Sequence, residues 1–422
     1  MRLAWQHDVP DPTVLRRTFI GARGEPPIGE AWAATQNPQG ARDEVAKALG
    51  IAASRVKVNV TLLGGGFGRK SKPDYVVEAA LLSRAVGAPV KVTWTREDDV
   101  QHDYYHTVTA QHYEGALDAQ GRATGWLART VFPSIQSTFA PNVKYGSQGE
   151  LDQGFDDVPY AIPNIRCENG EAEPHVRIGW FRSVSNIPHA FAVCSFADEL
   201  AHAAGRDPKD YLLELLGPPR HVDLSKEGVQ YGNYGDPIDV YPIDTGRLRG
   251  VVQLAAEKAG WGRPLLAGHG RGIPVHRSFV SYVAIVVEAV IGKDGTLSIP
   301  RVDMAVDCGF AAFPDRIHSQ MEGAAVMALS SALYGEVTFH DGRAQQTNFN
   351  NFQVARMKVA PRETHVYIVP SEAPPLGVGE PGVPPFAPAL CNAIFAATGK
   401  RIRRLPIGDQ LASSEGGQPG KS

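Results

Sequence analysis

Residues 62–70 read LLGGGFGRK, and this stretch decides how the rest of the chain is interpreted. Before it, residues 56–62 alternate between apolar and polar side chains with a period of two, which predicts a β-strand. After it, residues 74–86 carry apolar side chains at helical spacing and end at Gly87, which predicts a helix. Four glycines within five residues are costly in backbone entropy for an ordinary turn. The stretch therefore predicts a loop whose backbone comes very close to another group.

The glycine loop, residues 64–70, does not match either common phosphate-binding pattern. In a dinucleotide-binding G-x-G-x-x-G pattern, Gly64 and Gly66 fit, but Arg69 stands at the third glycine position. The same arginine stands where a P-loop needs its second glycine. A nest of backbone N–H groups beside Phe67, followed by basic side chains, would suit a flat polyanionic cofactor. A glycine-rich turn between a strand and a helix explains the same residues equally well. The basic side chains are Arg69, Lys70 and Lys72.

The composition is that of an ordinary soluble globular protein, with 422 residues, 43% hydrophobic and 21% charged. The net charge of −3 provides no basic field for nucleic acid or for an acidic membrane surface. No apolar run reaches membrane-spanning length, and the first thirty residues lack the apolar core of a secretory signal. The four cysteines contain no C-x-x-C pair, so we expect buried thiols rather than disulfides, a zinc site or an iron–sulfur site. They are Cys167, Cys194, Cys308 and Cys391.

The pattern of elements predicts an α+β fold, with mixed strands and helices in two intertwined halves. We expect the first half at 31–216 and the second at 245–410, separated at 217–244 by an excursion rich in Gly, Tyr and Pro. Residues 1–30 are expected to form an irregular lead-in, and residues 411–422 a disordered tail. Further predicted elements are helices at 38–49, 188–204, 208–216, 245–259 (capped by Thr245), 314–329 and 387–398, a strand at 89–94, and hairpins that turn at 293–295 and 340–342.

Two further segments shift the balance between the two interpretations of the glycine loop. One is Thr35-Gln36-Asn37, and the other is GVGEPGVPP at residues 377–385. With the glycine loop, with CSFADELA at 194–201 and with QMEG at 320–323, they resemble the molybdenum-binding subunit of the xanthine dehydrogenase/aldehyde oxidase family. The likeness runs from about residue 32 to residue 407 and is strongest to the isoquinoline 1-oxidoreductase large-subunit branch. Each motif is weak alone, whereas five of them in the family's order are specific.

The resemblance implies the fold of a molybdenum hydroxylase large subunit and a Mo-molybdopterin cofactor in its cytosine dinucleotide form. In that family the dithiolene of the pterin holds the metal, and no side chain ligates it. This agrees with a sequence in which no metal-ligand cluster is found. His102, His106 and His112 lack the glutamate of a zinc helix motif, so we expect loop structure there. No iron–sulfur cluster or flavin is expected in this chain.

The resemblance also implies roles for individual residues. Gln36 matches a glutamine that hydrogen-bonds an oxygen ligand of molybdenum, a task that suits a neutral amide; the alternative is a polar residue near a helix N-terminus. Arg182, in WFRS, matches an arginine that faces the substrate and stabilises developing charge, although its neighbours depart from the family's A-F-R-G-F-G pattern. Gln320 matches a glutamine that contacts the pterin or its nucleotide tail. The other expected cofactor-binding residues are Gly65, Gly66, Phe67, Gly68, Arg69 and Gly379.

Glu380 carries the chemistry in this interpretation. It lies in a loop of glycines and prolines with no cation beside it in sequence, and glutamate is rarely buried without a partner or a task. In the family the matching glutamate is the general base that activates a water-derived oxygen for attack on an electron-poor carbon. Its loss is expected to lower turnover by a factor on the order of 10²–10⁴. The alternative is a glutamate on a surface turn.

The main hypothesis is therefore a molybdopterin-dependent oxidoreductase that hydroxylates an electron-poor carbon of an N-heteroaromatic compound or an aldehyde. We find neither the E-M-G-Q-G-type motif nor the export signal that this branch normally carries upstream. A further chain or segment is therefore expected to supply the third wall of the site. Two electrons must also leave the metal, which requires a small [2Fe–2S] partner subunit. We expect residues 133–185 and 217–244 to shape the substrate pocket.

Two alternatives to this hypothesis stay open. A nucleotide-dependent dehydrogenase would use the glycine loop for a pyrophosphate and would bind NAD(P). A non-catalytic or truncated assembly subunit would carry only a relic of the site. The first thirty residues favour a cytoplasmic location by default, whereas relatives in this branch are often periplasmic.

Overall fold

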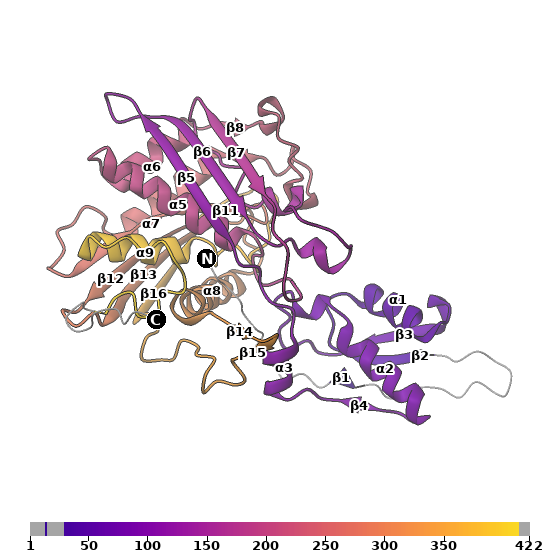
Figure 1. Ribbon diagram of the computed structural model, residues 1–422. Coiled ribbons are helices and arrows are strands. Elements are labelled where there is room, and N and C mark those ends of the chain that lie inside the picture. Colours follow the sequence, from indigo (N-terminus) through magenta and orange to yellow (C-terminus); the bar gives the residue numbers. More distant parts are fainter. Residues whose placement is uncertain (1–12, 15–28, 413–422) are drawn as a thin grey trace.

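The structure is a computed structural model that describes residues 13–14 and 29–412 of the chain. Figure 1 shows a small unit, which contains β1–β4 and α1–α3, beside a larger body that contains the remaining strands and helices. The predicted lead-in at 1–30 and the predicted tail at 411–422 fall almost wholly outside the described residues. Within those residues, no helix combines the length and the apolar character that a membrane crossing requires.

A mixed four-stranded sheet in the order β3-β2-β1-β4 forms the small unit. Strands β2 and β3 pair in parallel, and their inward alanines and valines pack with α1 and α2 in one apolar cluster. Helix α1 begins after Asn37, whose side chain accepts a hydrogen bond from the N–H of Gly40, and ends at Gly50 in the left-handed conformation. The elements are β1 (Thr13–Val14), β2 (Gly29–Ala33), α1 (Pro38–Leu49), β3 (Val56–Val60), α2 (Asp74–Val86), β4 (Lys91–Val92) and α3 (Arg96–His102).

The larger body is built around a five-stranded sheet in which β10, β12, β13 and β16 follow one another and β11 also pairs with β12. Strand β12 is apolar on both faces. Val283 and Ile285 pack in the cluster that contains α8 and α9, whereas Ala284 and Val286 pack in the cluster that contains α7. The elements are α7 (Thr245–Ala259), β10 (His269–Gly272), β11 (Val275–Ser278), β12 (Ser281–Ile291), β13 (Leu297–Asp307), α8 (Pro314–Tyr334), β16 (Glu363–Ile368) and α9 (Phe386–Thr398).

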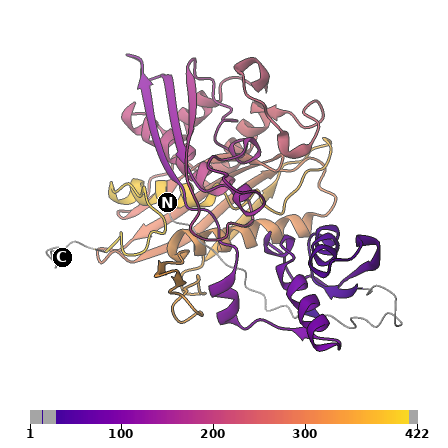
Figure 2. The same cartoon turned by 45° about the vertical axis from the view of Figure 1, so that its right-hand side comes forward.

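A three-stranded sheet in the order β5-β6-β7 covers helix α5, and Trp126 of β6 meets Phe196 of α5 with ring centroids 4.9 Å apart. Two short pairs, β8–β9 and β14–β15, complete the strands among the described residues. Figure 2 shows α8, in orange, lying across the molecule between the large sheet and the small unit. The elements are β5 (Ala110–Leu117), β6 (Ala123–Val131), α4 (Gln148–Leu151), β7 (Ile165–Gly170), α5 (Asn186–Ala203), α6 (Pro208–Leu216), β8 (His221–Val222), β9 (Ile243–Asp244), β14 (Phe339–His340) and β15 (Arg343–Ala344).

The predicted α+β class is confirmed, and most predicted helices begin and end within two residues of their observed bounds. Three details were wrong. The cap of α7 is Asp244, whose Oδ1 accepts from the N–H of Gly246 at 2.7 Å, while Thr245 is the first helical residue. Helix α8 continues to Tyr334 because its last turns stay buried, and the strand predicted at 89–94 shortens to two residues. All four cysteines are free thiols, and Cys194, Cys308 and Cys391 are buried.

Candidate active site

A cavity of about 690 Å³ opens where the glycine loop, helix α8 and the loop at 377–380 meet. Its size is that of a typical cofactor or ligand pocket. Ser319, Gly323 and Met327, one helical turn apart, line it from α8. Eight of the ten residues that the sequence suggested for the site also line it: Gln36, Gly65, Gly66, Phe67, Arg182, Gln320, Gly379 and Glu380.

The glycine loop is folded so tightly that side chains would not fit at two of its positions. A Cβ at Gly66 would lie 2.4 Å from the side-chain amide of Gln36. Gly68 has φ 94° and its backbone lies against Trp180, where a Cβ would come within 2.8 Å of the tryptophan carbonyl. The glycines therefore bring the loop into contact with the two segments that carry Gln36 and Arg182.

Gln36 is bound to the glycine loop through both its backbone and its side chain. Its N–H donates to the carbonyl oxygen of Lys70 at 2.9 Å, and its Oε1 accepts from the N–H of Gly68 at 3.0 Å. Thr35 Oγ1 donates to the same Lys70 carbonyl at 3.0 Å. Because the amide oxygen is engaged, the NH₂ group of the exposed Gln36 side chain is the part that can donate to a ligand.

Arg69 does not have the cofactor-binding position that the sequence suggested. Its guanidinium is buried, donates to both carboxylate oxygens of Asp74 at 2.8 and 3.0 Å, and forms an ion pair with Asp103. Burial raises the pKa of Asp103 to about 7, and the Arg69 cation opposes that rise. Arg69 does not line the cavity, because two carboxylates of the small unit hold it behind the loop. Gly68 also lies outside the lining and contributes its N–H to Gln36.

The other two basic residues after the glycines are also engaged within the protein. Lys70 Nζ donates to the carbonyl oxygen of Leu63 at 2.6 Å. Lys72 Nζ is buried without a hydrogen-bond acceptor among the described residues and lies 3.6 Å from the ring centroid of Phe139 and 4.6 Å from that of Trp180. Burial lowers the pKa of Lys72 to about 8, against the effect of Asp74. These side chains therefore support the loop rather than form a basic cradle.

Arg182 connects three parts of the cavity wall. Its Nε donates to the carbonyl oxygen of Gly379 at 2.5 Å, and its Nη2 donates to the backbone oxygen and to Oε1 of Gln320 at 3.1 and 3.0 Å. The side chain is 7% exposed, and burial lowers its pKa while the carboxylate of Glu380 opposes that change. The arginine thus stays a cation at physiological pH and fixes helix α8 against the loop at 377–380.

Glu380 has a carboxylate with no hydrogen bond or ion pair to any residue that the structure describes. Burial raises the pKa of this carboxyl group, and the Arg182 cation partly opposes the rise. A half-buried acid that lines a cavity beside a buried cation, yet binds nothing, is the arrangement expected of a functional group. Its raised pKa moves it toward the neutral range in which a general base works best.

The two stretches that were predicted to shape the substrate pocket contribute little to this cavity. Among the described residues that line the cavity, none comes from 217–244, and only Arg182 comes from 133–185. The excursion at 217–244 serves the core instead, because Asn233 Oδ1 and Tyr241 O accept hydrogen bonds from Arg277 Nη2 at 2.7 and 2.9 Å. Sequence reasoning missed the cavity residues Gly323, Met327, Ser330, Val354 and Ala355, although the first three follow Gln320 at helical spacing.

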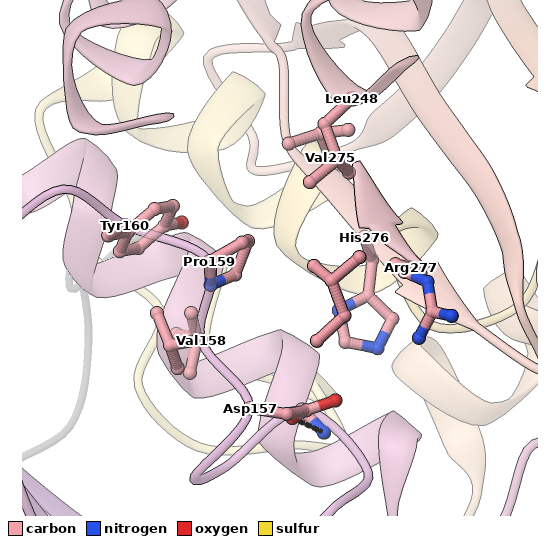
Figure 3. A pocket seen from close by; sticks show the side chains of 11 residues that line it. Asp157, Val158, Pro159, Tyr160, Leu248, Val275, His276 and Arg277 are labelled. Atoms are coloured by element: carbon pink, nitrogen blue, oxygen red, sulfur yellow. Dashed lines mark hydrogen bonds between the residues drawn. The ribbon is translucent and has the colours of Figure 1, made fainter. Parts of the chain in front are cut away.

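A second, much smaller cavity lies beside Arg277. Figure 3 shows Asp157 on one side of it and His276 and Arg277 on the other. Burial raises the pKa of Asp157 well above its usual value and lowers that of His276 to about 3. The volume of about 30 Å³ has room for a water molecule and not for a substrate. The cavity of about 690 Å³, which brings Glu380, Arg182 and the glycine loop together, is therefore the candidate active site.

The histidines that the sequence drew attention to do not gather in the structure. His106 bonds the carbonyl oxygens of Thr107 and Val184, and His112 bonds Glu114 at the surface. Over residues 13–14 and 29–412, no group of three or more His, Cys, Asp or Glu side chains is placed to hold a metal ion.

Comparison with known families assigns both halves of the chain to the same kind of module. Residues 28–212 and residues 238–361 match two family models that are both described as molybdopterin cofactor-binding domain. These two ranges together cover more than half of the chain. They contain Gln36, the glycine loop and Arg182 in the first, and Gln320 in the second.

Two similar proteins each match most of this chain. The chain is 32% identical to a membrane-bound aldehyde dehydrogenase [pyrroloquinoline-quinone] of Gluconacetobacter polyoxogenes, with 86% of this chain and 47% of that protein covered. It is 31% identical to the isoquinoline 1-oxidoreductase subunit beta of Brevundimonas diminuta, with 92% and 47% covered. The chain thus spans about half the length of these two relatives.

Solved structures share the fold. The chain superposes on the aldehyde oxidoreductase of Desulfovibrio gigas with a TM-score of 0.76 at 15% identity, over 97% of this chain and 60% of that one. A sequence identity of 15% supports a shared fold and nothing further. Taken with the two cofactor-binding modules and the named relatives, it shows that the chain belongs to the molybdopterin-binding subunits of the xanthine dehydrogenase family.

Proposed function

We propose that the chain forms the catalytic part of a molybdenum hydroxylase that inserts water-derived oxygen at an electron-poor carbon of an N-heteroaromatic compound or an aldehyde. The observation that carries the proposal is the carboxylate of Glu380, which lines the cavity without a partner and has a raised pKa. A base of this kind is ready to accept a proton from a reactant placed between it and the glycine loop.

The residues of the cavity fit a molybdopterin. Gly323 and Gly379 line the cavity, and a Cβ at either glycine would meet no atom within 4 Å, so these positions leave space that a side chain would take. The NH₂ group of Gln36, the backbone of Gly65 and Gly66 and the ring of Phe67 form the opposite wall. These residues and Gln320 would hold the cofactor. When bound, it supplies two-electron oxidation with water as the source of oxygen.

Two residues of the chain itself would take part in the reaction, Glu380 as a base and Arg182 as a cation. Glu380 accepts a proton in its ionised form, and its raised pKa makes that proton easier to hold at neutral pH. Arg182 keeps a positive charge in a site where little solvent screens it, which favours negative charge that develops on the substrate. Its hydrogen bonds to Gly379 and Gln320 hold that charge in place before the substrate arrives.

Electron transfer and completion of the site call for partners. The four cysteines are dispersed as free thiols, so a small subunit with [2Fe–2S] clusters is proposed to receive the electrons. A further chain or segment is proposed to close the cavity, because the relatives named above are about twice as long as the matched region. The cytosine dinucleotide form of the cofactor is part of the same proposal.

The proposal is tested on the chain purified together with its natural partners. We expect about one molybdenum per chain by elemental analysis, and turnover of an N-heteroaromatic compound or an aldehyde with a dye as electron acceptor. Substitution of Glu380→Gln should keep the molybdenum and lower turnover by a factor on the order of 10²–10⁴. A fully assembled complex without molybdenum, or one that carries pyrroloquinoline quinone instead, would overturn the proposal. Unchanged turnover of the Glu380→Gln variant would favour a non-catalytic assembly subunit.

A further inference from the structure

Three backbone carbonyls of the loop at 377–380 each accept a hydrogen bond from a side chain elsewhere in the fold. Ser281 Oγ donates to the carbonyl oxygen of Gly377 at 2.6 Å. Arg182 Nε donates to that of Gly379 at 2.5 Å, and Ser183 Oγ donates to that of Glu380 itself at 2.7 Å. The donors come from two segments nearly one hundred residues apart in sequence, at 182–183 and at 281.

Both serines are fully buried, and each lies in or directly after a segment with an unusual backbone conformation. Ser183 and Val184 have φ of 77° and 48°, and Phe279 and Val280, just before Ser281, have φ of 48° and 59°. Successive residues other than glycine in this left-handed region cost conformational energy and persist only where surrounding contacts hold them. Such strain is commonly found at functional sites. Here one strained pair contains Ser183 and the other directly precedes Ser281, and both serines bind the same loop.

The carboxylate of Glu380 has no partner of its own, as described above. Its position in the cavity is therefore set by the backbone that carries it, and not by contacts of its oxygens. The bonds from Ser183 and Ser281 fix that backbone on both sides of Gly379. Position 183 is also where the chain departs from the A-F-R-G-F-G pattern, because a serine stands in place of the first glycine after the arginine.

We propose that Ser183 and Ser281 are positioning residues that hold the Glu380 loop by its carbonyls and so aim the carboxylate into the cavity. The proposal rests on the proposed function of Glu380. The strained conformation at 183–184 and 279–280 directs the two hydroxyl groups at the loop, and the loop bonds in turn stabilise the strained segments. A purely structural role would require only that the buried hydroxyls find some acceptor.

The first test is hydrogen–deuterium exchange on the full chain, which needs no cofactor. The reporters are the amides of Leu376, which donates to Cys308 O, and of Val383, which donates to Glu380 O. Ser183→Ala and Ser281→Ala should each speed exchange of these amides about five- to tenfold, the size expected for one lost hydrogen bond. The matched control is Ser331→Ala, which removes a buried hydroxyl that donates to Met327 O inside helix α8. This control variant should leave the exchange rates of the loop amides unchanged.

Ser183→Gly separates the hydroxyl group from the backbone strain. Glycine adopts a φ of 77° freely, so this variant should regain thermal stability relative to Ser183→Ala while its loop exchanges as fast. If the loop amides of Ser183→Gly exchange as slowly as those of the wild type, backbone strain alone matters and the proposal is overturned. Wild-type exchange in the two alanine variants would overturn it as well.

The second test uses the enzyme assembled with its partners and loaded with cofactor. A loosened loop lets water reach Glu380, which lowers its raised pKa, so the acid limb of the kcat/KM profile should move to lower pH in Ser183→Ala. We expect kcat to fall at least tenfold with little change in KM, since the base is displaced and the binding walls remain. Faster exchange with an unmoved acid limb would overturn the positioning role. If Glu380→Gln keeps full turnover, the proposed function fails. The hydrogen–deuterium exchange of the first test then decides by itself whether Ser183 and Ser281 fix the loop.

Discussion

Arg182 donates from Nε to the carbonyl oxygen of Gly379 at 2.5 Å, which places a buried cation directly beside the backbone of the residue before Glu380. The same cation opposes the effect of burial on the carboxyl group of Glu380. The half-buried base, whose carboxylate has no hydrogen bond among the described residues, thus keeps a pKa that is raised but moderated. Arg182 thus influences both the position and the proton affinity of Glu380.

Removal of this cation should change the pH dependence in a defined direction. In Arg182→Met, burial is no longer opposed, so the pKa of Glu380 rises further and the ionised base exists only at higher pH. The acid limb of the kcat/KM profile should therefore move to higher pH, and kcat on its plateau should fall by a factor on the order of 10²–10³. Arg182→Lys, which keeps the charge, should shift the limb less. A limb that moves to lower pH would contradict this account.

Lys72 provides a test of stability against pH. Burial lowers its pKa from 10.5 to about 8, so between these values the unfolded chain binds more protons at this lysine than the folded chain. The contribution of Lys72 to stability should therefore rise as pH increases from about 8 to about 10.5. Lys72→Met removes the buried ammonium and should stabilise the protein at pH 7 by on the order of 1–3 kcal/mol.

The measurement for Lys72 is urea unfolding of both proteins at pH 7 and pH 10. The difference between variant and wild type should be largest at pH 7 and shrink at pH 10. If the variant is less stable than the wild type at pH 7, the contacts with Phe139 and Trp180 outweigh the cost of burying the charge.

Arg69 should behave as a structural residue and not as a cofactor ligand. Arg69→Met leaves Asp103 buried without its cation and should cost about 3–5 kcal/mol of unfolding free energy. The double variant with Asp103→Asn should cost less than the sum of the two single changes, because both partners of the pair are then removed. Molybdenum per folded chain should equal that of the wild type. A selective loss of molybdenum with intact stability would restore the role that the sequence suggested.

The sequence predicted those elements whose signals are local. Asp207 before α6, Gly50 after α1 and the Lys293-Asp294-Gly295 turn between β12 and β13 each satisfy backbone groups of their own neighbourhood. The two-residue strand β1 has no such signal, because it exists only through pairing with β2 and β4.

The same distinction between local and distant signals applies to the candidate active site. Glu380 and the glycine loop lie about three hundred residues apart in sequence, and no spacing rule brings them together; the family resemblance did. The side chain of Arg69 was expected at the cofactor and instead pairs with Asp103, because the charge of a residue does not reveal its partner, which here lies thirty-four residues further along the chain. Ser183 was overlooked because its importance comes from a carbonyl at Glu380 that only the fold brings near.

Two glycines inside helices give a direct test of where the cofactor lies. Gly323 in α8 lines the cavity, Gly250 in α7 does not, and a Cβ at either would meet no atom within 4 Å. Replacement of either by alanine should stabilise its helix by about 0.5–1 kcal/mol, because alanine loses less backbone entropy than glycine. Only Gly323→Ala should lower the molybdenum content, since its methyl group takes space in the cavity. Equal molybdenum in both variants would place the cofactor away from this turn of α8.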